Sequence, residues 1–165
     1  MPILDAHSLE IFSKSPEQTR RLGMRLGALL QVGDVICLQG ELGAGKTTLV
    51  QGAAQGWGSL DPVSSPTFVI VNDYTCSDGC HLAHLDAYRI ESLGEAEELD
   101  IPSLLLNGAL FVEWAERIEP ILPSDRLWVN MEYESEEHRS LCFHARGERY
   151  DFLIDQLRRN VFGVM

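Results

Sequence analysis

Leu38-Gln39-Gly40-Glu41-Leu42-Gly43-Ala44-Gly45-Lys46-Thr47-Thr48-Leu49 is the stretch of sequence that decides the fold. It fits the phosphate-binding pattern Gly-x-x-x-x-Gly-Lys-Ser/Thr. Glycines let such a loop curl until its backbone N–H groups point at phosphate oxygens. The flanking residues predict a strand over 34–38 and a helix over 46–56, the strand–loop–helix frame that this loop requires. The stretch therefore predicts a nucleoside triphosphate site.

The side chains of this loop have distinct expected roles. Lys46 can reach the β- and γ-phosphates as a point charge, so we count it among the catalytic residues, and the Thr47 hydroxyl can ligate Mg²⁺. The helix that follows adds its positive N-terminal end. The expected nucleotide-binding residues are Leu42, Gly43, Ala44, Gly45, Lys46, Thr47 and Thr48.

A P-loop site also needs a carboxylate that anchors Mg²⁺ where an apolar strand ends beside the loop. Glu113 follows the apolar run 109–112, and Asp86 ends a predicted strand over 80–86. Two such acids suggest a division of labour, in which one holds the metal and the other orients water. Glu113 is the better metal ligand because its strand is the more apolar, which leaves Asp86 for catalysis. Each acid could also be a helix N-cap or a surface acid.

Other residues near these motifs are open to two interpretations. Ser65 and Thr67 lie in a hydroxyl-rich loop that could order around the γ-phosphate as a switch, or could form an ordinary turn. Arg89 could stabilise transferred charge or pair with a neighbouring acid. Trp114 could cap the site or fill the core.

The remaining pattern predicts an α/β fold, a single P-loop domain over residues 1–165. We expect a three-layer sandwich whose central sheet is mostly parallel, with antiparallel additions. Ser15 is the expected N-cap of a first helix and Gly33 its C-terminal cap. A closing helix over 148–159 is expected to turn its apolar side chains inward, namely Phe152, Leu153, Ile154 and Leu157. Further strands are expected over 9–13, 67–74, 127–133 and 140–145.

The composition limits the possible partners. A net charge of −12 with two lysines among 165 residues argues against direct electrostatic binding to the phosphates of nucleic acid. The acidic clusters Glu91–Asp100 and Glu132–Glu137 are solvated faces or a docking surface for a basic partner. Nothing in the sequence reads as a membrane span or a secretory signal, so we expect a cytoplasmic protein.

Four residues tempt a zinc interpretation: Cys76, Cys80, His81 and His84. Strand alternation, however, puts Cys80 and His84 on one face of a strand and His81 on the other. One ion could not easily collect all four side chains, so we expect no zinc site.

Together these motifs resemble the TsaE (also called YjeE) family of bacterial ATPases, which assist tRNA threonylcarbamoyladenosine biosynthesis. The resemblance covers roughly residues 9–133. The matching segments are Gly40–Thr48, Ser65-Pro66-Thr67-Phe68, His84-Leu85-Asp86-Ala87-Tyr88-Arg89, Glu97-Glu98-Leu99 and Val112-Glu113-Trp114-Ala115. The family usually has Asp after the first glycine of the loop, where this chain has Glu41, a conservative departure.

The resemblance implies roles and partners. By it, Thr47 and Glu113 ligate Mg²⁺, Lys46 holds the phosphates of ATP, and Asp86 serves the hydrolytic step. Family members work with the TsaB and TsaD proteins and hydrolyse ATP slowly alone, and their turnover is thought to reset the transferase complex. The tRNA would then meet this chain only indirectly, through its partners.

Two alternatives remain open, a small-molecule P-loop kinase and a non-catalytic ATP-gated scaffold. A kinase would need an arginine-rich lid, and the paired arginines Arg20-Arg21 and Arg158-Arg159 lie far from the loop in sequence. A GTPase would need a lysine in its guanine-reading motif, and neither Lys14 nor Lys46 lies in one. We therefore expect ATP to be preferred over GTP.

Overall fold

The computed structural model describes residues 6–41, 43–59, 61, 71–76 and 78–162. Its strands are β1 (Ser8–Ser13), β2 (Val35–Gln39), β3 (Val71–Thr75), β4 (His81–Asp86), β5 (Gly108–Glu113), β6 (Arg126–Ser135) and β7 (His138–Arg146). Its α-helices are α1 (Pro16–Leu29), α2 (Lys46–Trp57), α3 (Leu93–Glu97), α4 (Ile101–Leu104) and α5 (Glu148–Phe162). Two 3₁₀ helices, η1 (Ala115–Arg117) and η2 (Glu119–Ile121), follow β5.

The seven strands form one sheet in the order β1-β7-β6-β2-β5-β4-β3. Strand β2 lies parallel to both β5 and β6, and β5 lies parallel to β4. The pairs β1–β7, β6–β7 and β3–β4 are antiparallel. The expected sheet, a parallel centre with antiparallel additions, is therefore confirmed.

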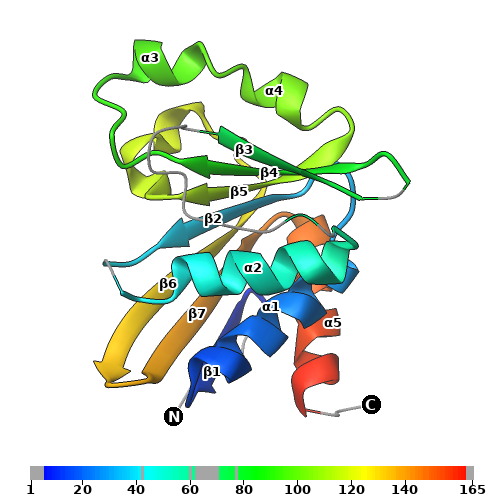
Figure 1. The fold of residues 1–165 in the computed structure, drawn as a ribbon, viewed down its shortest axis with the longest axis vertical. Coiled ribbons are helices and arrows are strands. Elements are labelled where there is room, and N and C mark those ends of the chain that lie inside the picture. Colours follow the sequence, from blue (N-terminus) through cyan, green and yellow to red (C-terminus); the bar gives the residue numbers. More distant parts are fainter. Residues whose placement is uncertain (1–5, 42, 60, 62–70, 77, 163–165) are drawn as a thin grey trace.

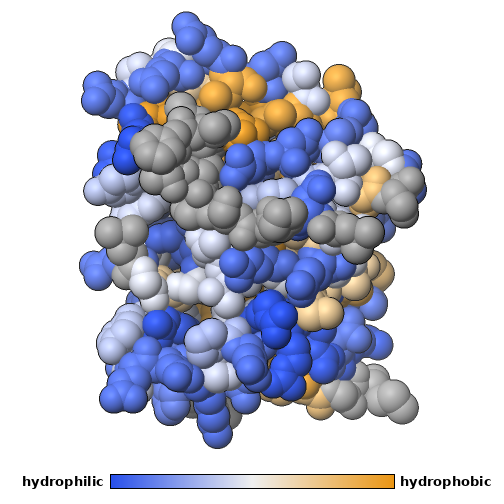
Figure 2. All heavy atoms as spheres, viewed as in Figure 1, coloured by the Kyte–Doolittle hydropathy of each residue, from blue (hydrophilic) through white to orange (hydrophobic). Residues whose placement is uncertain are grey.

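Helices cover both faces of the sheet (Figure 1). One apolar cluster joins the sheet to α1, α2 and α5, and the other joins it to α3, α4 and the two 3₁₀ helices. The central strands are buried on both sides because they lie between these layers. Around α3 and α4, Leu93 and Leu106 remain exposed, and Figure 2 shows apolar side chains gathering there on an otherwise largely hydrophilic face. The three-layer sandwich is confirmed.

Helices α1 and α2 pack with their backbones almost touching. A Cβ atom added at Gly27 of α1 would lie 2.1 Å from the carbonyl oxygen of Ala53 in α2. One added at Gly52 of α2 would lie 1.9 Å from the carbonyl oxygen of Arg20 in α1. No larger residue fits at either position, so these glycines set the distance between α1 and the helix that begins at Lys46.

Some local expectations are confirmed and others are wrong. Ser15 caps α1 by accepting a hydrogen bond from the Gln18 N–H at 3.1 Å, as expected. Gly33 does not cap that helix, which ends at Leu29; with φ of 94° it forms the turn that leads into β2. Phe152 is 56% exposed, because Tyr150 and not Phe152 completes the buried stripe of α5. Of the strand expected over 67–74, residues 67–70 lie outside the described part.

Candidate functional site

The phosphate-binding loop joins the buried strand β2 to the N-terminus of α2. Gly43 and Gly45 take φ angles of 83° and 97°, the left-handed region that side chains with a Cβ rarely adopt. Gly45 is the residue that precedes α2, so the helix begins at Lys46 without a side-chain cap. Its first N–H groups therefore remain available to an anion.

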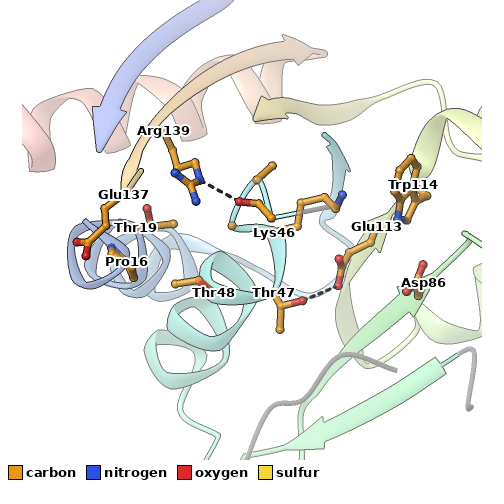
Figure 3. Close-up of a pocket in the computed structure, with 13 residues that line it drawn as sticks. Pro16, Thr19, Lys46, Thr47, Thr48, Asp86, Glu113, Trp114, Glu137 and Arg139 are labelled. Atoms are coloured by element: carbon orange, nitrogen blue, oxygen red, sulfur yellow. Dashed lines mark hydrogen bonds between the residues drawn. The ribbon is translucent and has the colours of Figure 1, made fainter. Parts of the chain in front are cut away.

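A cavity of about 300 Å³ opens over this loop. Residues 43–48, for which the sequence predicts nucleotide binding, line its floor. Its wall comes from Asp86, Glu113 and Trp114 on one side and from Pro16, Thr19, Glu137 and Arg139 on the other (Figure 3). The structure thus brings the predicted loop and both predicted acids together. Leu42, Ser65 and Thr67 lie outside the described residues, so their expected roles stay predictions.

The two acids end neighbouring parallel strands. Asp86 of β4 is the register partner of Glu113 of β5. The Thr47 hydroxyl donates to Oε2 of Glu113 at 3.5 Å, a long hydrogen bond that Figure 3 marks between the two side chains. Asp86 accepts a 2.9 Å hydrogen bond from the Tyr88 N–H, which turns the chain at the end of β4. Both acids therefore lie at the edge of the sheet where the loop begins.

The oxygen donors at this edge fit Mg²⁺. Thr47 and Glu113 offer a hydroxyl and a carboxylate, the hard ligands that this ion takes. No group of three or more His, Cys, Asp or Glu side chains in the described part of the chain could hold a metal by itself. Such a sparse donor set suits Mg²⁺, which usually keeps waters and takes its other ligands from phosphates.

Lys46 is 5% exposed and contacts its own loop. Its ammonium group donates to the carbonyl oxygens of Gly40 and Glu41, the latter at 3.2 Å. Burial lowers the pKa of Lys46, while the nearby carboxylates, Glu113 first among them, act in the opposite direction. Burial likewise raises the pKa of Asp86, against the hydrogen bond from Tyr88. A phosphate bound here would replace the loop carbonyls as the partner of Lys46, and its negative charge would favour the charged ammonium against the effect of burial.

Trp114 lies at the site. It directly follows β5 with a φ of 58°, a left-handed conformation that is uncommon for a bulky side chain. The ammonium of Lys46 is 4.3 Å from the centre of its ring, and the Tyr88 ring lies 4.9 Å away. Of the two interpretations that the sequence allowed, the position at the cavity wall agrees with a residue that caps the site.

The structure places four residues at the cavity wall for which sequence analysis predicts no role in the nucleotide site, namely Pro16, Thr19, Glu137 and Arg139. Arg139 of β7 donates to the Gly43 carbonyl at 3.0 Å, and its guanidinium lies 4.7 Å from the Tyr133 ring. Nothing in the sequence links Arg139 to a loop 96 positions away, because only the pairing of β6 with β7 brings it there. His84 is a candidate zinc ligand and the first residue of a family-matching segment in the sequence, and the structure places its Nε2 2.5 Å from Oε2 of Glu113. Arg89, in contrast, is exposed and is not among the residues of the cavity wall.

The residues of the considered zinc site have other partners. His81 contacts Asp73 at 2.9 Å, whereas His84 lies in the core. The Cys76 thiol donates to Asp78 in the turn. The absence of a zinc site stays a prediction.

Comparison with known proteins identifies the family of this chain. The model of the family TsaE, described as "Threonylcarbamoyl adenosine biosynthesis protein TsaE", matches residues 13–141. A tRNA threonylcarbamoyladenosine biosynthesis protein TsaE of Bacillus subtilis is 39% identical over 148 residues, which cover 88% of this chain and 91% of that protein. Its counterpart from Streptomyces coelicolor is 42% identical over 79% of this chain and 93% of its own length.

A solved structure is similar as well. The crystal structure of YdiB from the same Bacillus species superimposes with a TM-score of 0.75 at 34% identity, covering 93% of this chain and 96% of that one. The match of fold and sequence over most of the chain confirms the resemblance found in the motifs. The chain belongs to the TsaE family of tRNA threonylcarbamoyladenosine biosynthesis proteins.

Proposed function

We propose that this protein is a Mg²⁺-dependent ATPase that supports the TsaB–TsaD transferase in forming threonylcarbamoyladenosine beside the anticodon of tRNA. The observation that carries the proposal is the pairing of Asp86 with Glu113 at the mouth of a phosphate-binding loop that contains Lys46. Family members share the pathway name, and the geometry supports the chemical role within it.

The phosphates would lie over residues 43–48, where backbone N–H groups, the end of α2 and Lys46 favour negative charge. Thr47 and Glu113 would hold Mg²⁺, which neutralises charge on the β- and γ-phosphates when bound. Asp86 would orient the attacking water beside them. An acid in this position suits hydrolysis, because water is the nucleophile that a carboxylate can align without a second substrate pocket.

The base of ATP would lie at the other end of the cavity. Figure 3 shows Pro16, Thr19, Glu137 and Arg139 on the side away from Asp86 and Trp114. The planar guanidinium of Arg139 is held by the Gly43 carbonyl and can stack on an aromatic base. In this proposal, one wall of the cavity would bind the base and the loop would bind the phosphates.

The partners are proposed from the family and the charge. With a net charge of −12, this chain is suited to work through TsaB and TsaD, which would hold the tRNA.

None of the helices in the described ranges is long and apolar enough to cross a membrane. We place residues 1–165 in one cytoplasmic domain, whose ATP hydrolysis would reset the TsaB–TsaD complex after each cycle.

The test is phosphate release from ATP by the purified chain, measured alone and with TsaB and TsaD. We expect slow release alone, faster release with the partners, and loss of both in Lys46→Ala together with loss of ATP binding. Binding without release under either condition would favour the ATP-gated scaffold. Transfer of phosphate to a small molecule in place of water would favour the kinase.

A further inference from the structure

His84 is a fully buried polar residue with two hydrogen-bond partners. It lies in the middle of β4, and 0% of its surface is exposed. Its Nδ1 lies 3.1 Å from the Tyr74 hydroxyl, and its Nε2 lies 2.5 Å from Oε2 of Glu113. Both ring nitrogens are therefore paired, and the ring is held from two sides. A buried imidazole that is satisfied in this way has one preferred orientation.

The direction of the bond to Glu113 follows from its partners. With Glu113 in the proposed metal-binding role, its carboxylate is ionised and can only accept hydrogen bonds. Nε2 of His84 would then carry the proton and donate it to Oε2 of Glu113. In the tautomer with the proton on Nε2, Nδ1 is an acceptor, and the Tyr74 hydroxyl 3.1 Å away can donate to it. We call the hydrogen-bonded pair Tyr74–His84 the tether of Glu113. Its two residues lie on the neighbouring strands β3 and β4, and β4 pairs with the strand β5 that ends at Glu113.

The same oxygen of Glu113 is shared with the phosphate-binding loop. Oε2 also accepts the longer hydrogen bond from the Thr47 hydroxyl at 3.5 Å. His84 and Thr47 thus contact the same carboxylate oxygen from two different elements, β4 and α2. Glu113 also attracts the ammonium of Lys46. The hydrogen bond from His84 therefore acts on a carboxylate that Thr47 and the charge of Lys46 also attract.

We propose that His84, backed by Tyr74, is a positioning residue that holds the Glu113 carboxylate in the orientation required for Mg²⁺. The proposal rests on the proposed function, which assigns Glu113 to the metal. A carboxylate held before the metal arrives loses less rotational freedom when it binds. Partners behind metal ligands are typically worth ~10–100-fold in metal affinity or activity.

The test compares ATP affinity with saturating Mg²⁺ and in EDTA, by calorimetry on the full chain. In His84→Leu, which removes the tether, we expect the Mg²⁺-dependent gain in affinity to fall ~10–100-fold while affinity in EDTA stays near that of the unchanged protein. His84→Gln places an amide N–H near the position of Nε2 and should restore most of the gain. Tyr74→Phe should lower the Mg²⁺-dependent gain to a level between those of the unchanged protein and His84→Leu.

His81→Gln is the matched control, because His81 lies on the same strand but pairs with Asp73. It should leave the Mg²⁺-dependent gain unchanged. A purely structural His84 would lower the melting temperature of the variants without changing the ratio of the two affinities, and that outcome overturns the proposal. If His84→Leu does not fold, an unchanged ratio in Tyr74→Phe overturns it equally. A lack of Mg²⁺-dependent binding in the unchanged protein would instead refute the proposed function.

Discussion

Asp86 and Glu113 are register partners at the ends of the parallel strands β4 and β5, beside the loop that contains Lys46. Parallel pairing places both carboxylates at the same edge of the sheet. Their surroundings differ: Glu113 contacts Thr47 and His84, whereas Asp86 accepts a hydrogen bond from the Tyr88 N–H. This difference supports separate roles for the two acids.

Isosteric amide variants test the two roles. Glu113→Gln should lose the Mg²⁺-dependent part of ATP affinity, because an amide oxygen is a much weaker magnesium ligand than a carboxylate. Asp86→Asn should bind Mg²⁺–ATP almost unchanged while its turnover falls by ~10²–10⁴, the range for a group that acts in the transition state. Calorimetry and phosphate release with TsaB and TsaD provide the two measurements. Loss of Mg²⁺-dependent binding in Asp86→Asn but not in Glu113→Gln would mean that the roles are reversed.

Arg139 should contribute to nucleotide affinity independently of the metal. Arg139→Ala removes the guanidinium that contacts Gly43 and that we place against the base, so we expect ATP and ADP to bind ~3- to 10-fold more weakly. The loss should be equal in EDTA and in Mg²⁺, unlike that of Glu113→Gln. Arg139→Lys should recover little, since an ammonium does not stack as a planar group does. A loss confined to Mg²⁺ would contradict this placement of the base.

The close packing of α1 on α2 predicts a stability effect. Gly27→Ala should lower the free energy of unfolding by about 1–3 kcal/mol, because the new methyl group would meet the backbone of Ala53. The matched control is Gly94→Ala in α3, whose Cβ would meet only the Ser92 side chain at 4.0 Å. That variant should be neutral or slightly stabilising, by up to about 1 kcal/mol, because alanine favours helix. Urea titration measures the free energy of unfolding of both variants. If Gly27→Ala is as stable as Gly94→Ala, the two helices can move apart at no cost in stability, which contradicts the prediction.

Cys37 predicts a loss of stability at alkaline pH. Burial in β2 raises the pKa of its thiol from 9.0 to about 12. In the unfolded chain the thiol ionises at lower pH, so the unfolded state gains stability as the pH rises above about 9 and the folded state does not. Between pH 9 and pH 11, the unchanged protein should therefore lose stability relative to Cys37→Ala, which has no thiol at this position. A pH-independent difference would contradict the burial argument.

Local patterns were sufficient for much of the fold and for the principal residues of the site. The phosphate-binding loop is contiguous, and Glu113 and Asp86 each end an apolar strand, so the chain alone indicates them. Arg139 could not be found in this way, because its place at the loop depends on the pairing of β6 with β7. The bond from His84 to Glu113 likewise depends on the register of β4 with β5.

The errors at single positions have local causes. Gly33 has the positive φ expected of a capping glycine, but α1 ends earlier and the residue forms the following turn. Phe152 is apolar but lies off the stripe formed by Tyr150, Leu153, Ile154 and Leu157. Hydrophobicity alone misplaced it, whereas strict helical spacing would have chosen Tyr150.

Modification of tRNA in a reconstituted mixture tests the central claim most directly. The mixture contains tRNA, TsaB, TsaD and the enzyme that forms the carbamoyl-adenylate, with the unchanged protein, with Asp86→Asn, or with neither. We predict many rounds of threonylcarbamoyladenosine formation per TsaB–TsaD complex with the unchanged protein, and about one round with Asp86→Asn, which binds ATP but cannot reset the complex. Equal formation with Asp86→Asn and with the unchanged protein would contradict the claim that ATP hydrolysis drives the cycle.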